Sequence, residues 1–147
     1  MAKIIETTGS AFLPLPWRVM LKEKQQQRKE EINQWIREWS VILGLDKQWD
    51  FQIEYTKLEG TTAAQVDVDH PYKRAVIRFS NKQIFSCDTA FAKRVVVHEL
   101  VHVLFDEIEG PMGTWFGGGE LGKALHPHVE SLVDVLTNLL VGLVEKR

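Results

Sequence analysis

The residues best suited to do chemistry lie together in the segment His98-Glu99-Leu100-Val101-His102. Two histidines four positions apart project from one face of a helix, one turn from each other. Both imidazoles can then bind one metal ion, and zinc binds imidazole nitrogen at about 2.0–2.1 Å. Glu99 lies one step further round the helix, where its carboxylate can act as general base for a water on the metal. The segment therefore predicts a metal site with hydrolytic chemistry.

The sequence around this segment is strongly apolar. The apolar positions are Val95, Val96, Leu100, Val101, Val103 and Leu104. A helix that is apolar on nearly every side is buried in a core. Because burying an unpaired imidazole or carboxylate is costly, the polar side chains on such a helix need a partner, and a metal ion supplies one.

A third ligand is needed, since a catalytic zinc usually takes three protein ligands and a water. Glu130 is the first candidate, because it lies on an otherwise apolar helix with Asp134 one turn further along. A carboxylate at that second position can hold a ligand imidazole through its other nitrogen. His126 and His128, beside the start of the same helix, are the alternative third ligands.

The order His98-Glu99-x-x-His102, then Glu130-x-x-x-Asp134 on a later helix, resembles the gluzincin metallopeptidases, the thermolysin-like clan. The modest length is similar to that of the minimal members, the minigluzincins. The resemblance covers roughly residues 22–145. It implies a zinc metallopeptidase with one Zn²⁺ per chain, bound by His98, His102 and Glu130. In that family Glu99 would be the general base and Asp134 would support His98.

The resemblance also implies a way to bind the substrate. In the family, the strand before the metal helix pairs its main chain with an extended peptide. Here that strand would be formed by Ala75, Val76, Ile77, Arg78, Phe79 and Ser80. No family signature locates the group that stabilises the oxyanion, for which Tyr72, His126 and His128 are candidates.

A function of another class stays open beside the peptidase. A domain this short offers few walls for a substrate cleft. The chain would then be a catalytically silent or latent module, stabilised by zinc, that acts through interaction or regulation.

The remaining chain predicts the elements that position the site. In residues 22–43 the apolar side chains recur every three or four positions, which is typical of a helix. Three short segments with alternating apolar residues, near Phe51–Tyr55, Val66–Val68 and Ala75–Phe79, predict strands. Strands this close together in the sequence favour a small, largely antiparallel meander.

The ends of the later helices are predicted from capping and helix-breaking residues. The metal helix is expected from Asp88 to about Phe105, with Asp88 or Ser86 as N-cap. Residues 106–125 look like a glycine-rich connection, and Pro127 is expected in the first turn of the last helix. With residues 1–21 as an irregular arm, these elements predict one α+β domain over residues 22–147. Its three-stranded sheet would pack against about three helices in a zincin-like fold.

Composition limits the partners and the compartment. The 147 residues carry a formal net charge of −2, so no basic surface for nucleic acid is expected. Cys87 is the single cysteine, which excludes an intramolecular disulfide. It is interpreted as a small buried residue, or alternatively as a thiol acidified at a helix start. No secretion signal is visible, and Glu130 and Asp134 argue against a membrane span in the last helix. The sequence predicts a cytoplasmic protein whose partner is a peptide or protein substrate.

Overall fold

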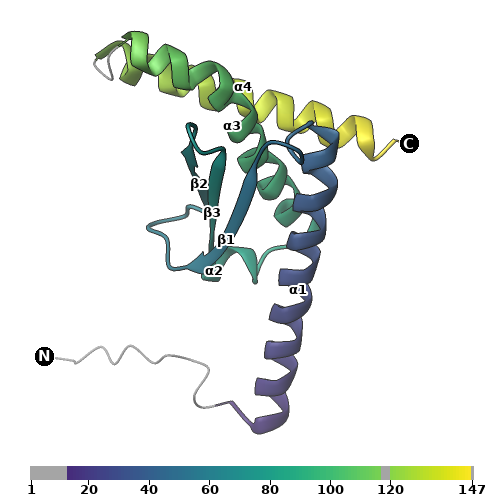
Figure 1. Cartoon of the computed structure of the whole chain (residues 1–147). Coiled ribbons are helices and arrows are strands. Elements are labelled where there is room, and N and C mark those ends of the chain that lie inside the picture. The colour runs from purple at the N-terminus through teal and green to yellow at the C-terminus, as the bar shows by residue number, and fades with distance from the viewer. Residues whose placement is uncertain (1–12, 117–119, 147) are drawn as a thin grey trace, which may run out of the picture.

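The computed structural model describes residues 13–116 and 120–146, and it confirms the predicted α+β fold (Figure 1). This part of the chain forms four helices and one three-stranded sheet. The elements in chain order are α1 (Leu15–Ile42), β1 (Asp50–Thr56), β2 (Ala64–Asp69), β3 (Arg74–Ser80), α2 (Asn81–Ile84), α3 (Thr89–Phe116) and α4 (Glu120–Val144).

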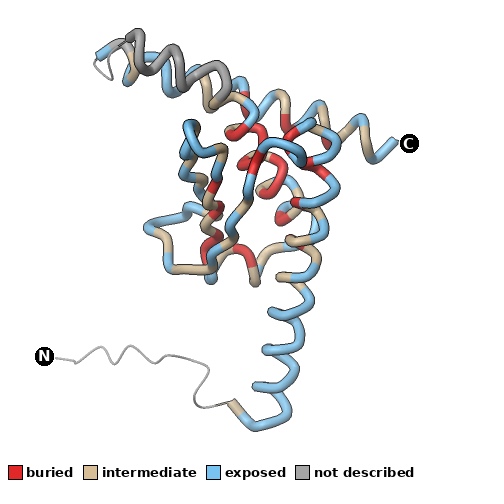
Figure 2. The backbone as a smooth tube through the Cα atoms, viewed as in Figure 1, coloured by how far each residue is buried: buried red, intermediate tan, exposed pale blue. Residues whose placement is uncertain are grey.

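Helix α1 begins at Leu15, earlier than its apolar periodicity predicts. The irregular arm expected up to residue 21 is therefore wrong for residues 15–21, whereas residues 1–12 lie outside the described part. Pro16 stands in the first turn of α1, where a missing backbone N–H leaves no helical hydrogen bond unmade. The first turns of α1 are exposed, and the second half packs into the core through Ile32, Ile36 and Trp39 (Figure 2).

The sheet has the order β1-β3-β2, so β3 lies in the centre. β2 pairs with β3 antiparallel, whereas β1 pairs with β3 in parallel. The predicted meander is therefore wrong, because β1 and β2 are not neighbours. The physical reason is burial: Ala75, Ile77 and Phe79 of β3 are fully buried, so β3 suits the central place. The alternating half-exposed residues of β1 and β2 suit the two edges.

Helix α3 passes through the core and contacts α1, α4 and β2. Its middle turns are buried, as predicted, through Val96, Val97, Leu100, Val101 and Val103. This burial gives the helix that carries the two histidines a fixed position against the sheet.

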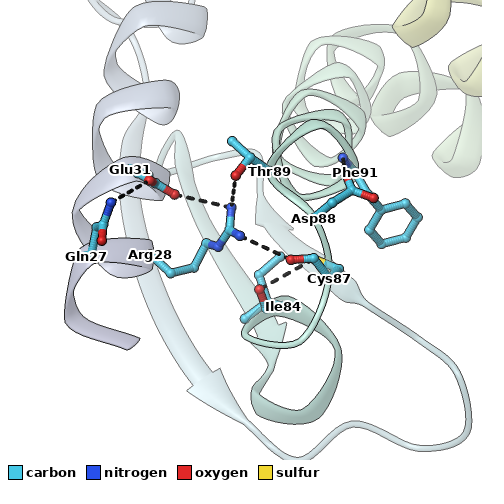
Figure 3. Close-up of polar contacts among 8 residues, drawn as sticks. All are labelled: Gln27, Arg28, Glu31, Ile84, Cys87, Asp88, Thr89 and Phe91. Carbon is cyan, nitrogen blue, oxygen red and sulfur yellow. Dashed lines mark hydrogen bonds and ion pairs between the residues drawn. The ribbon is translucent and has the colours of Figure 1, made fainter. Parts of the chain in front are cut away.

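The start of α3 is held by polar contacts with α1 (Figure 3). Asp88 is the N-cap, and its Oδ1 accepts a hydrogen bond of 2.8 Å from the backbone N–H of Phe91. Arg28 of α1 donates from Nη2 to the carbonyl of Cys87 at 3.1 Å, and its Nη1 lies 3.2 Å from Glu31 Oε2. Burial raises the pKa of the Cys87 thiol although the charge of Arg28 opposes this, so the alternative of an acidified thiol is not supported.

Helices α3 and α4 are both longer than predicted, and they lie side by side (Figure 1). The connection expected at residues 106–125 is wrong over most of its length, because α3 continues to Phe116 and α4 begins at Glu120. Pro127 lies inside α4 instead of in its first turn. Glycine and proline disfavour helices locally, but packing between two long helices can override that preference.

In the described part of the chain, one helix is long and apolar enough to cross a membrane, judged by length and composition alone. The segment Gly122–Val144 has a mean hydropathy of 1.3, and 17% of its window is buried. A single helix of this kind is weak evidence of a membrane span. Glu130 and Asp134 interrupt the segment, and both face the histidines of α3.

Candidate metal centre

Helices α3 and α4 bring three potential ligands together. His98 Nε2 lies 3.1 Å from His102 Nε2, and Glu130 carboxylate oxygens lie 3.7 Å and 3.4 Å from these two nitrogens respectively. One ligand atom from each of the three residues falls within 4.8 Å of the others. A tetrahedral zinc ion with bonds of about 2.0–2.1 Å separates its ligand atoms by about 3.3–3.4 Å. The donor set therefore fits one ion of the size of zinc.

Asp134 contacts the other nitrogen of His98. Its Oδ1 lies 3.1 Å from His98 Nδ1, one helical turn beyond Glu130 on α4. A proton on Nδ1, donated to this carboxylate, leaves the lone pair of Nε2 free and directed toward Glu130. Such a contact fixes both the tautomer and the ring orientation that metal binding requires.

Glu99 is buried beside this cluster. It is 6% exposed, and burial, followed by the charge of Glu130, raises the pKa of its carboxyl to about 8. A cation bound nearby would favour the ionised form of the carboxylate. The group can therefore hold or release a proton near neutral pH, as a general base must.

His102 is held in its neutral form by its surroundings. Burial lowers the pKa of the imidazole, and the neighbouring His98 adds to this, whereas Glu130 opposes it. A metal binds the neutral imidazole, so the site does not have to lose a proton here before it takes up an ion.

A cavity of about 500 Å³ opens onto the cluster. Its walls include His98, Glu99, His102 and Glu130 on the two helices, and residues 64–68 of β2 on the other side. The structure does not support the expectation that Ala75–Ser80 of β3 pair with a substrate. β3 is hydrogen-bonded to β1 and to β2, so it offers no free edge. Alternation predicts β2 as a strand, but nothing local to it reveals that β2 becomes the edge beside the metal site.

The other predicted candidates have different positions. His126 lines the cavity, and its Nε2 lies 3.9 Å from Glu130 Oε1, but it is not part of the three-residue donor set. Tyr72 and His128 are exposed, and neither lines this cavity.

A histidine–aspartate pair at the edge of the cavity was not predicted. His70 Nδ1 lies 2.7 Å from Asp106 Oδ2, and Asp106 lines the cavity one turn beyond His102. The ring of His70 also packs edge-on against Trp49, with centroids 6.1 Å apart. From the sequence, His70 is interpreted as a turn residue before Pro71, and its partner Asp106 is far away in the chain.

Known proteins give no independent indication of what this group of side chains does. No family model, no curated protein and no solved structure matches the chain. A function can therefore be proposed only from the chemistry of the described side chains and from the spacing of the candidate site residues in the sequence.

Proposed function

We propose that the protein is a zinc metallopeptidase of the gluzincin type. His98, His102 and Glu130 would bind one Zn²⁺, and Glu99 would be the general base. The observation that carries the proposal is the buried Glu99 beside a three-donor set that opens onto a cavity. Zinc in such a site supplies a Lewis acid for a carbonyl and acidifies a bound water.

The residues of the chain divide the remaining tasks. The Glu99 carboxylate accepts a proton from the attacking water and delivers it to the nitrogen of the leaving amine. Asp134 orients His98 through Nδ1. His126, on the wall of the cavity, is the candidate for contact with the developing oxyanion, because an imidazole N–H can donate to it.

The open cavity favours catalysis over the silent or latent module. A structural zinc site is closed by four protein ligands, whereas a catalytic site leaves one position for water or substrate. Among the described residues, three ligands come within bonding reach of one ion, and the space beside them is open.

A peptide is the substrate class that the walls of the cavity support. β2 is an edge strand, and residues 64–68 line the cavity. A free strand edge offers main-chain donors and acceptors to an extended chain, which is how peptides add to sheets. The substrate-binding role that the family resemblance implied for β3 is accordingly proposed for β2.

Metal analysis combined with digestion of a peptide library tests the proposal. We expect about one zinc per chain in the wild type and in Glu99→Gln, because Glu99 is not a ligand. Loss of the base should lower the rate of hydrolysis about 10²–10⁴-fold. The matched control is Glu23→Gln, the same change at an exposed position of α1, which should leave the rate unchanged. Wild-type turnover by Glu99→Gln, or no cleavage by the zinc-loaded wild type, would contradict a peptidase.

A further inference from the structure

A second cavity lies on the other side of His98 and Glu99, between α3 and α4. Its volume is about 330 Å³, and it shares Ala64, His98 and Glu99 with the cavity at the metal centre. Glu99, the proposed general base, therefore lines both cavities. A substrate held with its scissile bond at Glu99 would have a neighbouring side chain within reach of the second cavity.

Part of the wall of the second cavity is apolar. Phe91 and Val95 of α3 line it, together with Ala64 at the start of β2 and Ala63 just before it. Phe91 is 47% exposed, so its ring offers apolar surface that the fold itself leaves uncovered. Such walls suit the methylene groups of a side chain that enters the cavity.

The second cavity is also lined by Arg94, whose guanidinium has no carboxylate partner among the described residues. Arg94 of α3 donates from Nη2 to the side-chain oxygen of Asn138, and among the described residues it forms no ion pair. The neighbouring Lys93, in contrast, lies 3.7 Å from Glu145 and does not line the cavity. Arg94 therefore keeps donors and a positive charge available to a ligand.

A buried hydroxyl completes the polar part of the wall. Thr137 of α4 is 3% exposed, and its Oγ1 has no hydrogen-bond partner in the described structure. Leaving a buried hydroxyl unsatisfied is unfavourable, and an acceptor that enters the cavity would relieve this. The carboxylate of Asp134 also lines the cavity, but it lies 3.1 Å from His98 Nδ1 and is occupied there.

We propose that this second cavity binds the substrate side chain next to the cleaved bond and selects an acidic one, glutamate above all. The aliphatic part of the glutamate would contact Phe91 and Val95. Its carboxylate would accept hydrogen bonds from Arg94 and Thr137. The proposal rests on the proposed peptidase function, since that function gives the scissile bond its place at Glu99.

Cleavage of matched peptides measures this preference. The probes are peptides that differ only in having Glu, Gln, Leu or Lys at one position beside the cleaved bond. We expect the wild type to prefer Glu over Gln about tenfold in kcat/KM, as a charge-assisted hydrogen bond would give. Arg94→Gln should remove the preference, and Arg94→Glu should shift it to Lys. Thr137→Val, which keeps the shape and removes the hydroxyl, should reduce the preference for Glu.

The adjacent residue provides the control. Lys93→Glu makes the same change of charge on the same helix, outside the cavity, and should keep the preference for Glu. A preference that is absent in the wild type, or that Arg94→Glu leaves intact, would overturn the proposal. An equal shift in Lys93→Glu would also overturn it, because the effect would then come from overall charge.

A binding measurement separates this proposal from the peptidase proposal. The probes are three zinc-chelating hydroxamate peptides with Glu, Gln or Leu as the side chain, titrated calorimetrically into the zinc-loaded protein. Tighter binding of the Glu probe, reversed by Arg94→Glu, would support the acidic pocket even if no peptide were cleaved, and the peptidase alone would then fail. Equal binding of all three probes, or none, would overturn the pocket, whatever the rate of hydrolysis.

Discussion

The carboxylates of Glu130 and Asp134 stand one turn apart on α4, and they approach different nitrogens of one imidazole. Glu130 lies 3.7 Å from His98 Nε2, whereas Asp134 lies 3.1 Å from His98 Nδ1. The first position suits a metal ligand and the second suits an orienting group. Two residues of the same charge are thus expected to differ in what their removal does.

Alanine substitutions should separate these two roles. Glu130→Ala removes a proposed ligand, so we expect the purified protein to hold no zinc. Asp134→Ala should keep a site but lower zinc affinity or activity about 10–100-fold, since only the orientation of the ligand is lost. Competition with a chelating dye measures both. His128→Ala is the control and should match the wild type; retention of full affinity by Glu130→Ala would refute the ligand set.

Glu99 should make the stability of the metal-free protein depend on pH. Its pKa is about 8 in the folded protein, against an ordinary value of 4.5, mainly because it is buried. Between these values the folded state holds one more proton than the unfolded state, so the free energy of unfolding falls as pH rises. The lowered pKa of His102 acts in the opposite direction, and this contribution fades as the pH rises above its ordinary value of 6.5.

In the upper part of the window from pH 6.5 to 8, the change in stability therefore comes mainly from Glu99. With a chelator present, we expect the stability to fall over this window by about 2 kcal/mol at most. Urea unfolding at several pH values measures it. Glu99→Gln should abolish the fall, whereas Glu23→Gln should preserve it. A stability that rises with pH in the wild type would contradict the burial of an uncharged Glu99.

At the scale of secondary structure, local patterns predict the type of each element better than its neighbours or its ends. Alternation locates all three strands, but the pairing of β1 with β3 joins segments that are distant in the sequence. The burial of β3 decides this order, and no single strand reveals it. For the same reason the sequence does not reveal that β3, the strand expected to pair with a substrate, is central and that β2 forms the edge beside the candidate metal centre.

For the helices, too, local patterns predict the type of element better than its neighbours. The spacing of His98, Glu99 and His102 predicts their common place on one helix, because helical geometry fixes it. The approach of Glu130 to both histidines depends on how α4 packs along α3, and capping residues carry no information on that. The sequence pattern does not single out Arg94 or Thr137, because the proposed role of both residues depends on a cavity between α3 and α4.

At the scale of the whole molecule, the exposed apolar surface of α4 raises the question of whether the protein inserts into a membrane. Several of its large apolar residues are exposed, among them Leu132, Leu139 and Leu143. A carboxylate in a bilayer is costly, however, and Glu130 and Asp134 lie in the middle of the apolar segment with partners on α3. We therefore propose that α4 stays packed on the protein and does not insert into a bilayer.

Fractionation of cells that produce the protein checks this. We expect it in the supernatant after high-speed centrifugation, and expect it not to float with liposomes of neutral lipid. Glu130→Leu with Asp134→Leu removes both carboxylates and should move the protein toward the membrane fraction. Wild-type protein found in the membrane fraction and released by detergent alone would contradict the proposal that α4 stays packed on the protein.

The position of Glu130 on the last helix also has a consequence for the order of events on the ribosome. The strands, α3 and both histidines are synthesised first, and the nascent chain then offers an ion two nitrogens and no carboxylate from α4. Because metal binding couples to folding, zinc bound by the proposed ligands would link the docking of α4 on α3 to completion of the site. Under the proposed function, a nascent chain stalled before α4 would therefore hold both histidines but lack the complete ligand set.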